Sequence, residues 1–359
     1  MPVLYLALNP GDYFGWGVCS KYLIQELGRL TEIQVINDHN IKLLTDRALP
    51  GSVFHGIADH SLRRLYPIGG VKNYGYTFFE DLLHRDAPLY ARFYDIVFAG
   101  STWCKERLDE KGISWAQTLI QGVDPDIFFP IDFEKPSGVD KFIIFSGGKF
   151  ELRKGQDLVL RAVKVLQDKY DDIVLMNMWH NRWKFSFETM KKSLYITFNI
   201  RGKSWEEIIN NIMADNGIDP ERNIVLPPIN NKQLRNVYAN TDIGIFPNRC
   251  EGGTNLVLME YMACAKPVIA SYNTGQKDIL TEDNALLLKD MKPYKVIDKQ
   301  NRLTAIWEEP NLDELISKLE SAYLNRHKLP RIARQAGEDM KRFTWQATAK
   351  HLLNKIGLR

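Results

Sequence analysis

Short apolar runs alternate with amphipathic stretches along both halves of the chain, and this alternation restricts the fold more than any other feature. In the first half, residues 3–9, 33–37 and 96–100 are typical of buried strands, and residues 18–30 of an amphipathic helix. Strands that alternate with helices favour parallel sheets wrapped by helices, so we predict an α/β fold.

The second half restarts the same pattern after residue 141. We predict strands at 142–147, 173–178, 223–226, 243–247 and 268–272, and helices at 156–169, 232–240 and 256–264. A chain of 359 residues is long for one core, which favours two domains. The stretch DPDIFFPIDFEKPSGVD lacks a clear period, so we place a linker near residues 130–140.

Composition narrows the class of protein. With 45% hydrophobic and 25% charged residues and a net charge of +3, the chain resembles a soluble globular protein without the clustered basic face of a nucleic-acid binder. No apolar run reaches the roughly 18 residues of a membrane span, and the first residues are expected to form a strand rather than a signal peptide. The four cysteines have no metal or CxxC spacing, which favours reduced thiols in the cytoplasm: Cys19, Cys104, Cys250 and Cys264.

Ligands of parallel sheets usually lie beyond the carboxyl ends of the strands, so the loops there are the candidate sites. In NPGDYFGWG, residues 9–17, Gly15 and Gly17 let the backbone approach an anion at a helix N-terminus. A tight turn explains these two glycines equally well.

A second loop is FSGGKFELRKGQ, in which Gly148 is followed by Lys149, Arg153 and Lys154. Cations at a strand end beside a helix start suit a diphosphate, because charge-assisted contacts strengthen where water is excluded. The spacing is not that of a P-loop. A solvated, lysine-rich helix start is the alternative.

The third loop, in NRCEGGTNLVLMEYMACAKPVIAS, joins two carboxylates to a glycine pair. Its candidate residues are Glu251, Gly252, Gly253, Thr254, Asn255, Leu256 and Glu260. Asn255 or Thr254 can cap the following helix, whose free N–H groups favour an anion. Carboxylates accept hydrogen bonds from vicinal hydroxyls, so Glu251 and Glu260 suit a sugar. Otherwise Glu260 is exposed and Glu251 complements the helix dipole. The next loop, residues 271–280, receives no predicted role.

The order of these motifs resembles the nucleotide-sugar-binding domain of family 4 glycosyltransferases, which are retaining enzymes of the GT-B fold. The resemblance is strong over residues 142–288 and weaker in FAGSTWCKERLDEKGI and GVDPDIFFP of the first half. RFTWQA looks like the start of a C-terminal helix that crosses back. The implied organisation is two Rossmann-like domains facing a cleft: 1–133 for the acceptor, 134–340 for the donor, and 341–359 as the crossing helix.

By this resemblance, Lys149 and Lys154 hold the donor diphosphate, Glu251 contacts the donor sugar and Glu260 the ribose. The backbone near Thr254 and Leu256 meets the phosphates. The family usually has seven residues between the two glutamates and this chain has eight. Residues 227–231 are expected beside the base of the nucleotide, but their identity does not distinguish uracil from guanine. Residues 177–217 depart from the family pattern.

The reacting centre has two candidates. Many family members carry a histidine in a first-domain loop, and either His55 or Glu80 occupies such a loop here. The implied reaction is a front-face displacement with retention, in which the leaving diphosphate takes the acceptor proton. It requires no protein nucleophile and no metal. The pair Asp124 and Asp126 is therefore interpreted as a turn rather than as a metal site.

The predicted function is transfer of a sugar from a UDP- or GDP-linked donor to a glycan, lipid-linked or other hydroxyl acceptor, as in polysaccharide biosynthesis. An inactive scaffold of the same fold, or another GT-B activity such as a nucleotide-sugar epimerase, is the alternative. The location is the cytoplasm or the cytosolic face of a membrane. Basic and aromatic residues mix at 60–79, which is either a membrane contact or a solvated loop.

Overall fold

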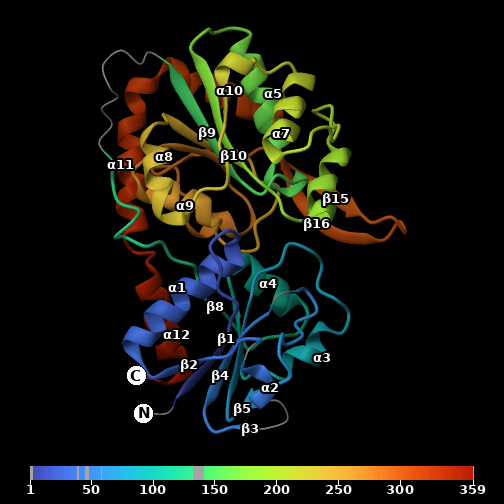
Figure 1. Ribbon diagram of the computed structural model, residues 1–359, viewed down its shortest axis with the longest axis vertical. Helices are drawn as coiled ribbons and strands as arrows, with labels where there is room; N and C mark the ends of the chain where they lie inside the picture. The colour runs from blue at the N-terminus through green and yellow to red at the C-terminus, as the bar shows by residue number, and fades with distance from the viewer. Residues whose placement is uncertain (1–2, 39, 45–47, 58, 132–140, 359) are drawn as a thin grey trace.

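The computed structural model describes residues 3–38, 40–44, 48–57, 59–131 and 141–358. The chain forms two lobes, each built on a six-stranded sheet whose strands all run parallel (Figure 1). The predicted α/β fold with two parallel sheets is confirmed. The predicted boundary at 133/134 lies outside the described residues.

The N-terminal sheet has the strand order β2-β1-β4-β6-β7-β8. Its strands are β1 (Leu4–Ala7), β2 (Ile33–Val35), β4 (Ser52–Gly56), β6 (Asn73–Thr77), β7 (Ile96–Ala99) and β8 (Ala116–Thr118). The lobe also contains α1 (Gly15–Leu30), α2 (Ile41–Leu44), α3 (Ala87–Ala91), α4 (Thr102–Glu110) and the short pair β3 (Ala48–Leu49) and β5 (Gly69–Gly70). The three strands and the helix predicted here are confirmed, with slightly different ends.

The C-terminal sheet has the order β11-β10-β9-β12-β13-β14. Its strands are β9 (Phe142–Gly148), β10 (Ile173–Trp179), β11 (Asn223–Val225), β12 (Ile243–Phe246), β13 (Val268–Ser271) and β14 (Leu286–Leu288). The α-helices are α5 (Gln156–Gln167), α6 (Lys184–Phe187), α7 (Trp205–Asp215), α8 (Leu234–Ala239), α9 (Leu256–Ala263), α10 (Leu312–Leu324) and α11 (Leu329–Met340). Single 3₁₀ turns are η1 (Leu152–Lys154), η2 (Glu188–Lys192), η3 (Pro220–Arg222), η4 (Asn231–Gln233), η5 (Thr274–Asp278) and η6 (Arg326–Lys328). Every strand and helix predicted in this half is confirmed, because strands buried on both faces read as apolar runs.

The strand order of the C-terminal sheet indicates where a ligand is expected to bind. The C-terminal sheet grows outward in both directions from β9, so the chain reverses its direction of growth between β9 and β12. Loops that leave the carboxyl ends of two such strands diverge and open a crevice, which is where ligands of doubly wound sheets bind. The loop after β9 carries Lys149, and the loop after β12 carries Glu251.

A hairpin that the sequence analysis did not predict joins the two lobes. Strands β15 (Met291–Ile297) and β16 (Leu303–Pro310) form an antiparallel pair that projects from the C-terminal lobe (Figure 1). The amide of Leu82 donates to the carbonyl of Thr304 at 2.7 Å, and the indole N–H of Trp307 donates to the carbonyl of Glu80 at 2.9 Å. The hairpin therefore holds the N-terminal loop that contains Glu80.

Helix α12 (Trp345–Ile356) leaves the C-terminal lobe and packs beside α1 in the N-terminal lobe (Figure 1). The Thr344 hydroxyl caps it by accepting the Ala347 amide at 3.1 Å. Trp345 and Leu352 are buried in the same core as β1, and the Trp345 ring stacks on Tyr22 of α1 with centroids 5.6 Å apart. The chain thus ties the two lobes together twice.

The segment 60–79 does not form an exposed aromatic surface. Tyr66, Tyr74 and Phe79 are buried, because the segment contributes β6 and a core loop. The Arg64 guanidinium stacks over the Phe93 ring, 4.6 Å from its centroid. The interpretation of this segment as a membrane contact is therefore not supported. Within the described ranges, no helix is long and apolar enough to cross a bilayer.

We predict that Leu352→Ala lowers the free energy of unfolding by about 2–5 kcal/mol, the cost of a cavity in a packed core. Leu352 is fully buried. Chemical denaturation measures the change, with Lys350→Ala on the exposed face of the same helix as the matched control. Equal stabilities of the two variants would show that α12 does not dock on α1.

Candidate functional site

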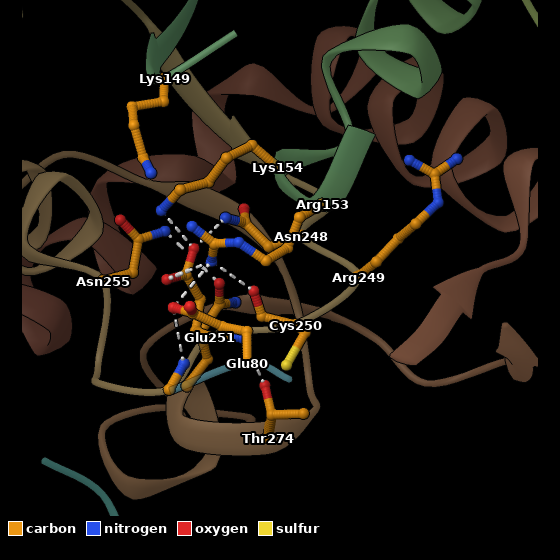
Figure 2. Close-up of polar contacts among 12 residues, drawn as sticks. Glu80, Lys149, Arg153, Lys154, Asn248, Arg249, Cys250, Glu251, Asn255 and Thr274 are labelled. Carbon is orange, nitrogen blue, oxygen red and sulfur yellow. Dashed lines mark hydrogen bonds and ion pairs between the residues drawn. The ribbon is translucent and has the colours of Figure 1, made fainter. Parts of the chain in front are cut away.

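Charged side chains from both lobes meet at the crevice between β9 and β12. Figure 2 shows Arg153, Lys154 and Asn248 directed toward Glu251, with Glu80 of the other lobe beside them. The structure therefore brings together Lys154, Glu251 and Glu80, three of the residues predicted for the site.

The first part of the site is the loop that follows β9. Gly148 has φ +111°, a left-handed conformation that only glycine adopts without strain. The Lys149 side chain is partly exposed, with its Nζ 3.5 Å from Glu151 Oε1 and 5.2 Å from the centre of the Trp183 ring. Lys149 is thus a cation at the rim of the crevice that an incoming anion can reach.

Arg153 is the centre of the cluster, and the sequence analysis gave it no separate role. Its Nη2 lies 2.6 Å from Glu151 Oε1, and its Nη1 lies 3.2 Å from both Glu251 Oε2 and Glu80 Oε1. Nη1 also donates to the carbonyl of Cys250 at 2.8 Å. One buried guanidinium therefore binds three carboxylates, two from its own lobe and one from the other.

Glu251 is held as a carboxylate by its neighbours. Lys154 Nζ donates to its Oε1 at 2.5 Å, and the Asn248 amide donates to the same oxygen. Burial raises the pKa of Glu251, but Lys154 and Arg153 outweigh it and lower the pKa overall. The backbone N–H of Glu251 donates to the Thr274 hydroxyl at 2.9 Å, which orients the residue.

The glycine pair lets the two lobes touch. A Cβ on Gly252 would lie 2.5 Å from the Phe79 carbonyl oxygen, and one on Gly253 would lie 2.5 Å from Gln121 Oε1. The Gly252 amide donates to Glu80 Oε1 at 3.3 Å, and its carbonyl accepts from the Ser101 hydroxyl at 2.7 Å. Both glycines are thus required by the N-terminal lobe, whereas the sequence analysis connected them with phosphate.

Helix α9 begins at Leu256 with its first amides near the crevice. Asn255 is the cap, with φ +65° and its side-chain oxygen 3.5 Å from the Leu258 amide. The Thr254 hydroxyl is buried and donates to the sulfur of Met259. Asn255 is therefore the predicted cap that the structure confirms, and Thr254 is not.

Glu260 is buried inside the protein, so the alternative of an exposed carboxylate is wrong. The Asn231 amide donates to Oε1 at 2.6 Å and the Tyr238 hydroxyl to Oε2 at 3.4 Å. Burial raises the pKa of Glu260 to about 8, against the lowering effect of these two bonds. Asn231 Oδ1 in turn accepts from the Tyr22 hydroxyl at 2.9 Å. The contact with a ribose stays a prediction.

His55 does not join the site. It lies within β4, fully buried, with Phe93 and Tyr94 packed edge-on against its ring. Its Nε2 is 3.3 Å from Asn73 Oδ1, and burial lowers the pKa of His55 to about 4. This is the environment of a neutral core histidine, which contradicts the prediction that His55 lies in a substrate-facing loop.

The glycines of the first loop have different surroundings. Gly15 begins α1 and is exposed, with open space where a Cβ would lie. A Cβ on Gly17 would lie 2.7 Å from the Gly11 Cα, and the Gly11 amide donates to the Gly17 carbonyl at 3.0 Å. Gly17 is thus explained by a tight turn, the alternative left open by the sequence.

Asp124 lies in a turn, where its Oδ1 accepts the Asp126 amide at 3.0 Å. No cluster of potential metal ligands occurs among the residues for which the structure gives positions. Beside Glu80 is a cavity of about 330 Å³ between the lobes. Its lining comprises Phe79, Glu80, Asp81, Leu82, Leu83, Trp103, Arg107, Glu110, Lys111, Thr274, Ile306 and Glu308.

Comparison with protein families identifies the C-terminal lobe. Residues 140–305 match the family described as glycosyl transferases group 1. This part of the chain is therefore similar to the glycosyltransferase domains of that family. The match includes the loops of Lys149, Lys154, Glu251 and Glu260. No curated protein sequence matches the chain.

Solved structures extend the likeness in fold to both lobes. Sucrose-phosphate synthase from Thermosynechococcus elongatus has a TM-score of 0.71 at 13% identity, covering 99% of this chain and 98% of that one. HepE from Anabaena, in complex with UDP and glucose, has a TM-score of 0.65 at 12% identity over 99% of both chains. A trehalose-6-phosphate synthase studied for glycosyl transfer with retention has a TM-score of 0.61 at 14% identity, covering 96% and 80%. The fold is GT-B, as predicted.

The buried Glu260 gives a prediction about pH. Because its folded pKa of about 8 exceeds the ordinary value of 4.5, its contribution to stability is complete below pH 4.5 and is lost as the pH rises to about 8. Denaturant unfolding should therefore show Glu260→Gln gaining stability relative to the wild type between pH 5 and 8, and no further above.

The variant Glu251→Gln is the contrast, because Glu251 has a lowered pKa and its contribution is lost only as the pH falls. A difference between Glu260→Gln and wild type that stays constant from pH 5 to 9 would contradict a protonated Glu260.

Proposed function

We propose that the chain transfers a sugar from a nucleoside-diphosphate sugar to a hydroxyl acceptor, with retention at the anomeric carbon. The observation that carries this proposal is the ion pair of Lys154 with Glu251 at the reversal of the C-terminal sheet, in the loops that also carry Lys149 and the start of α9. Cations and helix amides suit a diphosphate, and an adjoining carboxylate suits sugar hydroxyls.

A UDP-sugar is the first donor to consider. HepE was solved with UDP and with UDP-glucose, and TarM from S. aureus with UDP. GDP remains the second candidate, as the resemblance implied. In this proposal the Glu260 carboxylate accepts hydrogen bonds from the ribose hydroxyls. The Asn231 amide, which donates to Oε1 in the structure, then shares this oxygen with a hydroxyl or moves away from it.

Donor binding requires an exchange of ionic partners. The site holds three cations (Lys149, Arg153 and Lys154) against three carboxylates (Glu80, Glu151 and Glu251). A bound diphosphate adds negative charge. Lys154 then exchanges its ion pair with Glu251 for one with the diphosphate. The freed Oε1 of Glu251 then accepts a hydroxyl of the donor sugar, so the same ion pair prepares both halves of the donor site.

In the reaction, the bond from the anomeric carbon to the diphosphate oxygen breaks, and a bond to the acceptor oxygen forms on the same face. The acceptor proton passes to the departing diphosphate. Lys149, Lys154 and the first amides of α9 stabilise the charge on that leaving group. In this proposal Glu80, whose Oε1 accepts the Gly252 amide, lies beside the sugar.

The acceptor is a glycan or lipid-linked hydroxyl that enters along the cavity beside Glu80, as in polysaccharide biosynthesis at the cytoplasmic side of a membrane. The cavity offers carboxylates and the Trp103 ring, a combination that suits a sugar. An inactive scaffold would have no use for a cation and a carboxylate joined at the crevice. An epimerase has no acceptor, so it would not need the cavity beside Glu80 in addition to the donor crevice.

We predict that UDP raises the melting temperature of the wild-type protein, because a ligand of the folded state stabilises it by about 2.7 kcal/mol at 100 times Kd. Lys154→Ala should weaken UDP binding about 10- to 100-fold through loss of one charge-assisted contact. Thermal shift against UDP, GDP, ADP and CMP measures both effects.

The control is Arg161→Ala, which removes a cation from the exposed face of α5, the helix that follows Lys154. No shift with any of the nucleotides, or equal shifts in wild type and Lys154→Ala, would favour the scaffold.

We further predict that Glu80→Gln lowers the rate of UDP release from the preferred UDP-sugar about a hundredfold, with the melting shift by UDP unchanged. Glu80 belongs to the N-terminal lobe, and its Oε1 contacts the Gly252 amide and Arg153 of the other lobe. A coupled assay for free UDP measures the rate, and Glu106→Gln, at an exposed position of α4 outside the cavity lining, is the comparison. Full activity of Glu80→Gln would remove Glu80 from the reacting centre.

A further inference from the structure

The segment between β10 and α7 exposes aromatic rings that the proposed function does not use. Arg182, Trp183, Lys184 and Phe185 are exposed one after another, so cations and rings alternate on the surface. Phe185 is 77% exposed, more than a soluble surface usually allows a phenylalanine. An exposed ring between two cations marks a contact with something apolar and negatively charged.

The same segment concentrates the positive charge of the chain. Residues 180–204 contain one acid, Glu188, and six cations: Arg182, Lys184, Lys191, Lys192, Arg201 and Lys203. Their net charge is +5, whereas the whole chain carries +3, so the remainder is negative by two. Lys191 pairs with Glu188 at 3.1 Å, whereas Arg182 and Lys184 are exposed and form no ion pair with a described carboxylate.

These residues lie at the rim of the crevice. The Trp183 ring packs edge-on against Phe14 of the N-terminal lobe, with centroids 6.3 Å apart, and Lys149 Nζ lies 5.2 Å from its centre. Tyr13, next to Phe14, is 59% exposed. Both lobes therefore contribute rings to one surface beside the predicted diphosphate site.

The hairpin extends the surface on its other side. Lys192, at the end of η2, donates through its Nζ to the Ile297 carbonyl at the end of β15, at 2.6 Å. The contact fixes η2 against the projecting hairpin (Figure 1). The segment that carries the exposed Trp183 and Phe185 rings is thus attached to the hairpin.

We propose that this basic–aromatic patch (Tyr13, Arg182, Trp183, Lys184, Phe185, Lys191 and Lys192) rests on a bilayer of anionic phospholipid, with the crevice opening toward the lipid headgroups. Lysines and arginines are attracted to the negative surface, and aromatic rings settle at the level of the headgroups. The patch replaces residues 60–79 as the membrane-facing surface, since the rings there are buried.

The rings decide between a bilayer and a soluble polyanion. A polyanion would use the cations but would leave Phe185 in water, whereas an interface takes up the ring and the charge together. The inference is independent of the proposed function, because binding to lipid requires no donor and can be measured without one.

The experiment is co-sedimentation of the full chain with vesicles of phosphatidylcholine alone, or of equal parts phosphatidylcholine and phosphatidylglycerol, at about 0.1 M salt, where surface charges still act over ~10 Å. We expect binding to the anionic vesicles only. The double variant Phe185→Ser with Lys184→Glu should bind at least about tenfold more weakly, since one lysine near the surface contributes about 1 kcal/mol and its reversal more.

The matched control is Leu324→Ser with Lys328→Glu, which makes the same kind of change at exposed positions at the end of α10 and in η6. Retained binding by the control together with loss in the patch variant supports the proposal. Equal binding of patch variant and control, or no binding of the wild type to anionic vesicles, overturns it. Patch-dependent capture of soluble dextran sulfate without vesicle binding also overturns it. The melting temperature without ligand verifies that each variant is folded.

Discussion

The buried guanidinium of Arg153 is the constraint on which the other features of the site depend. Removing one partner from a buried ion pair costs more than the pair contributes, so all of its carboxylates must stay in place. Glu151 and Glu251 come from the C-terminal lobe, but Glu80 comes from the N-terminal lobe, and it is present only while the lobes touch. Contact at that distance excludes any side chain at position 252. Three features keep the lobes in contact at this point: the glycine pair, the hydrogen bond from the hairpin to the Glu80 loop, and the hydroxyl of Ser101.

Much of the C-terminal sheet could be predicted from the sequence, because its strands are covered on both faces and appear as uninterrupted apolar runs. The strand β6, with the sequence NYGYT, could not, because its glycine and tyrosines are equally typical of a loop. The hairpin has polar residues on both strands and is stabilised by partners far along the chain, such as Leu82 and Arg249. Local pattern carries no information about such contacts.

The site was predictable where its chemistry lies in single loops and not where it depends on contacts between loops. Lys149, Lys154 and Glu251 stood out as charges at strand ends. In the sequence, Arg153 did not differ from the neighbouring cations, because its contact with Glu80 of the other lobe exists only in the folded chain. His55 was misplaced because SVFHG is itself a strand, which turns the imidazole into the core. Glu260 was noticed as a carboxylate in an apolar helix, but its partner Asn231 comes from an unrelated loop.

The hairpin β15–β16 belongs to neither six-stranded sheet, yet Ile306 and Glu308 from it form one wall of the cavity beside Glu80. A change at the exposed Ile306 alters the shape of that wall, whereas Ala305 and Trp307 of the same strand are buried in the core of the C-terminal lobe. Under the proposed function, the donor residues lie in loops of the six-stranded sheet, and part of the acceptor wall lies on the hairpin. Variation at the exposed positions of this hairpin, with its buried residues kept, would then give the same fold a differently shaped acceptor wall, in evolution or by design.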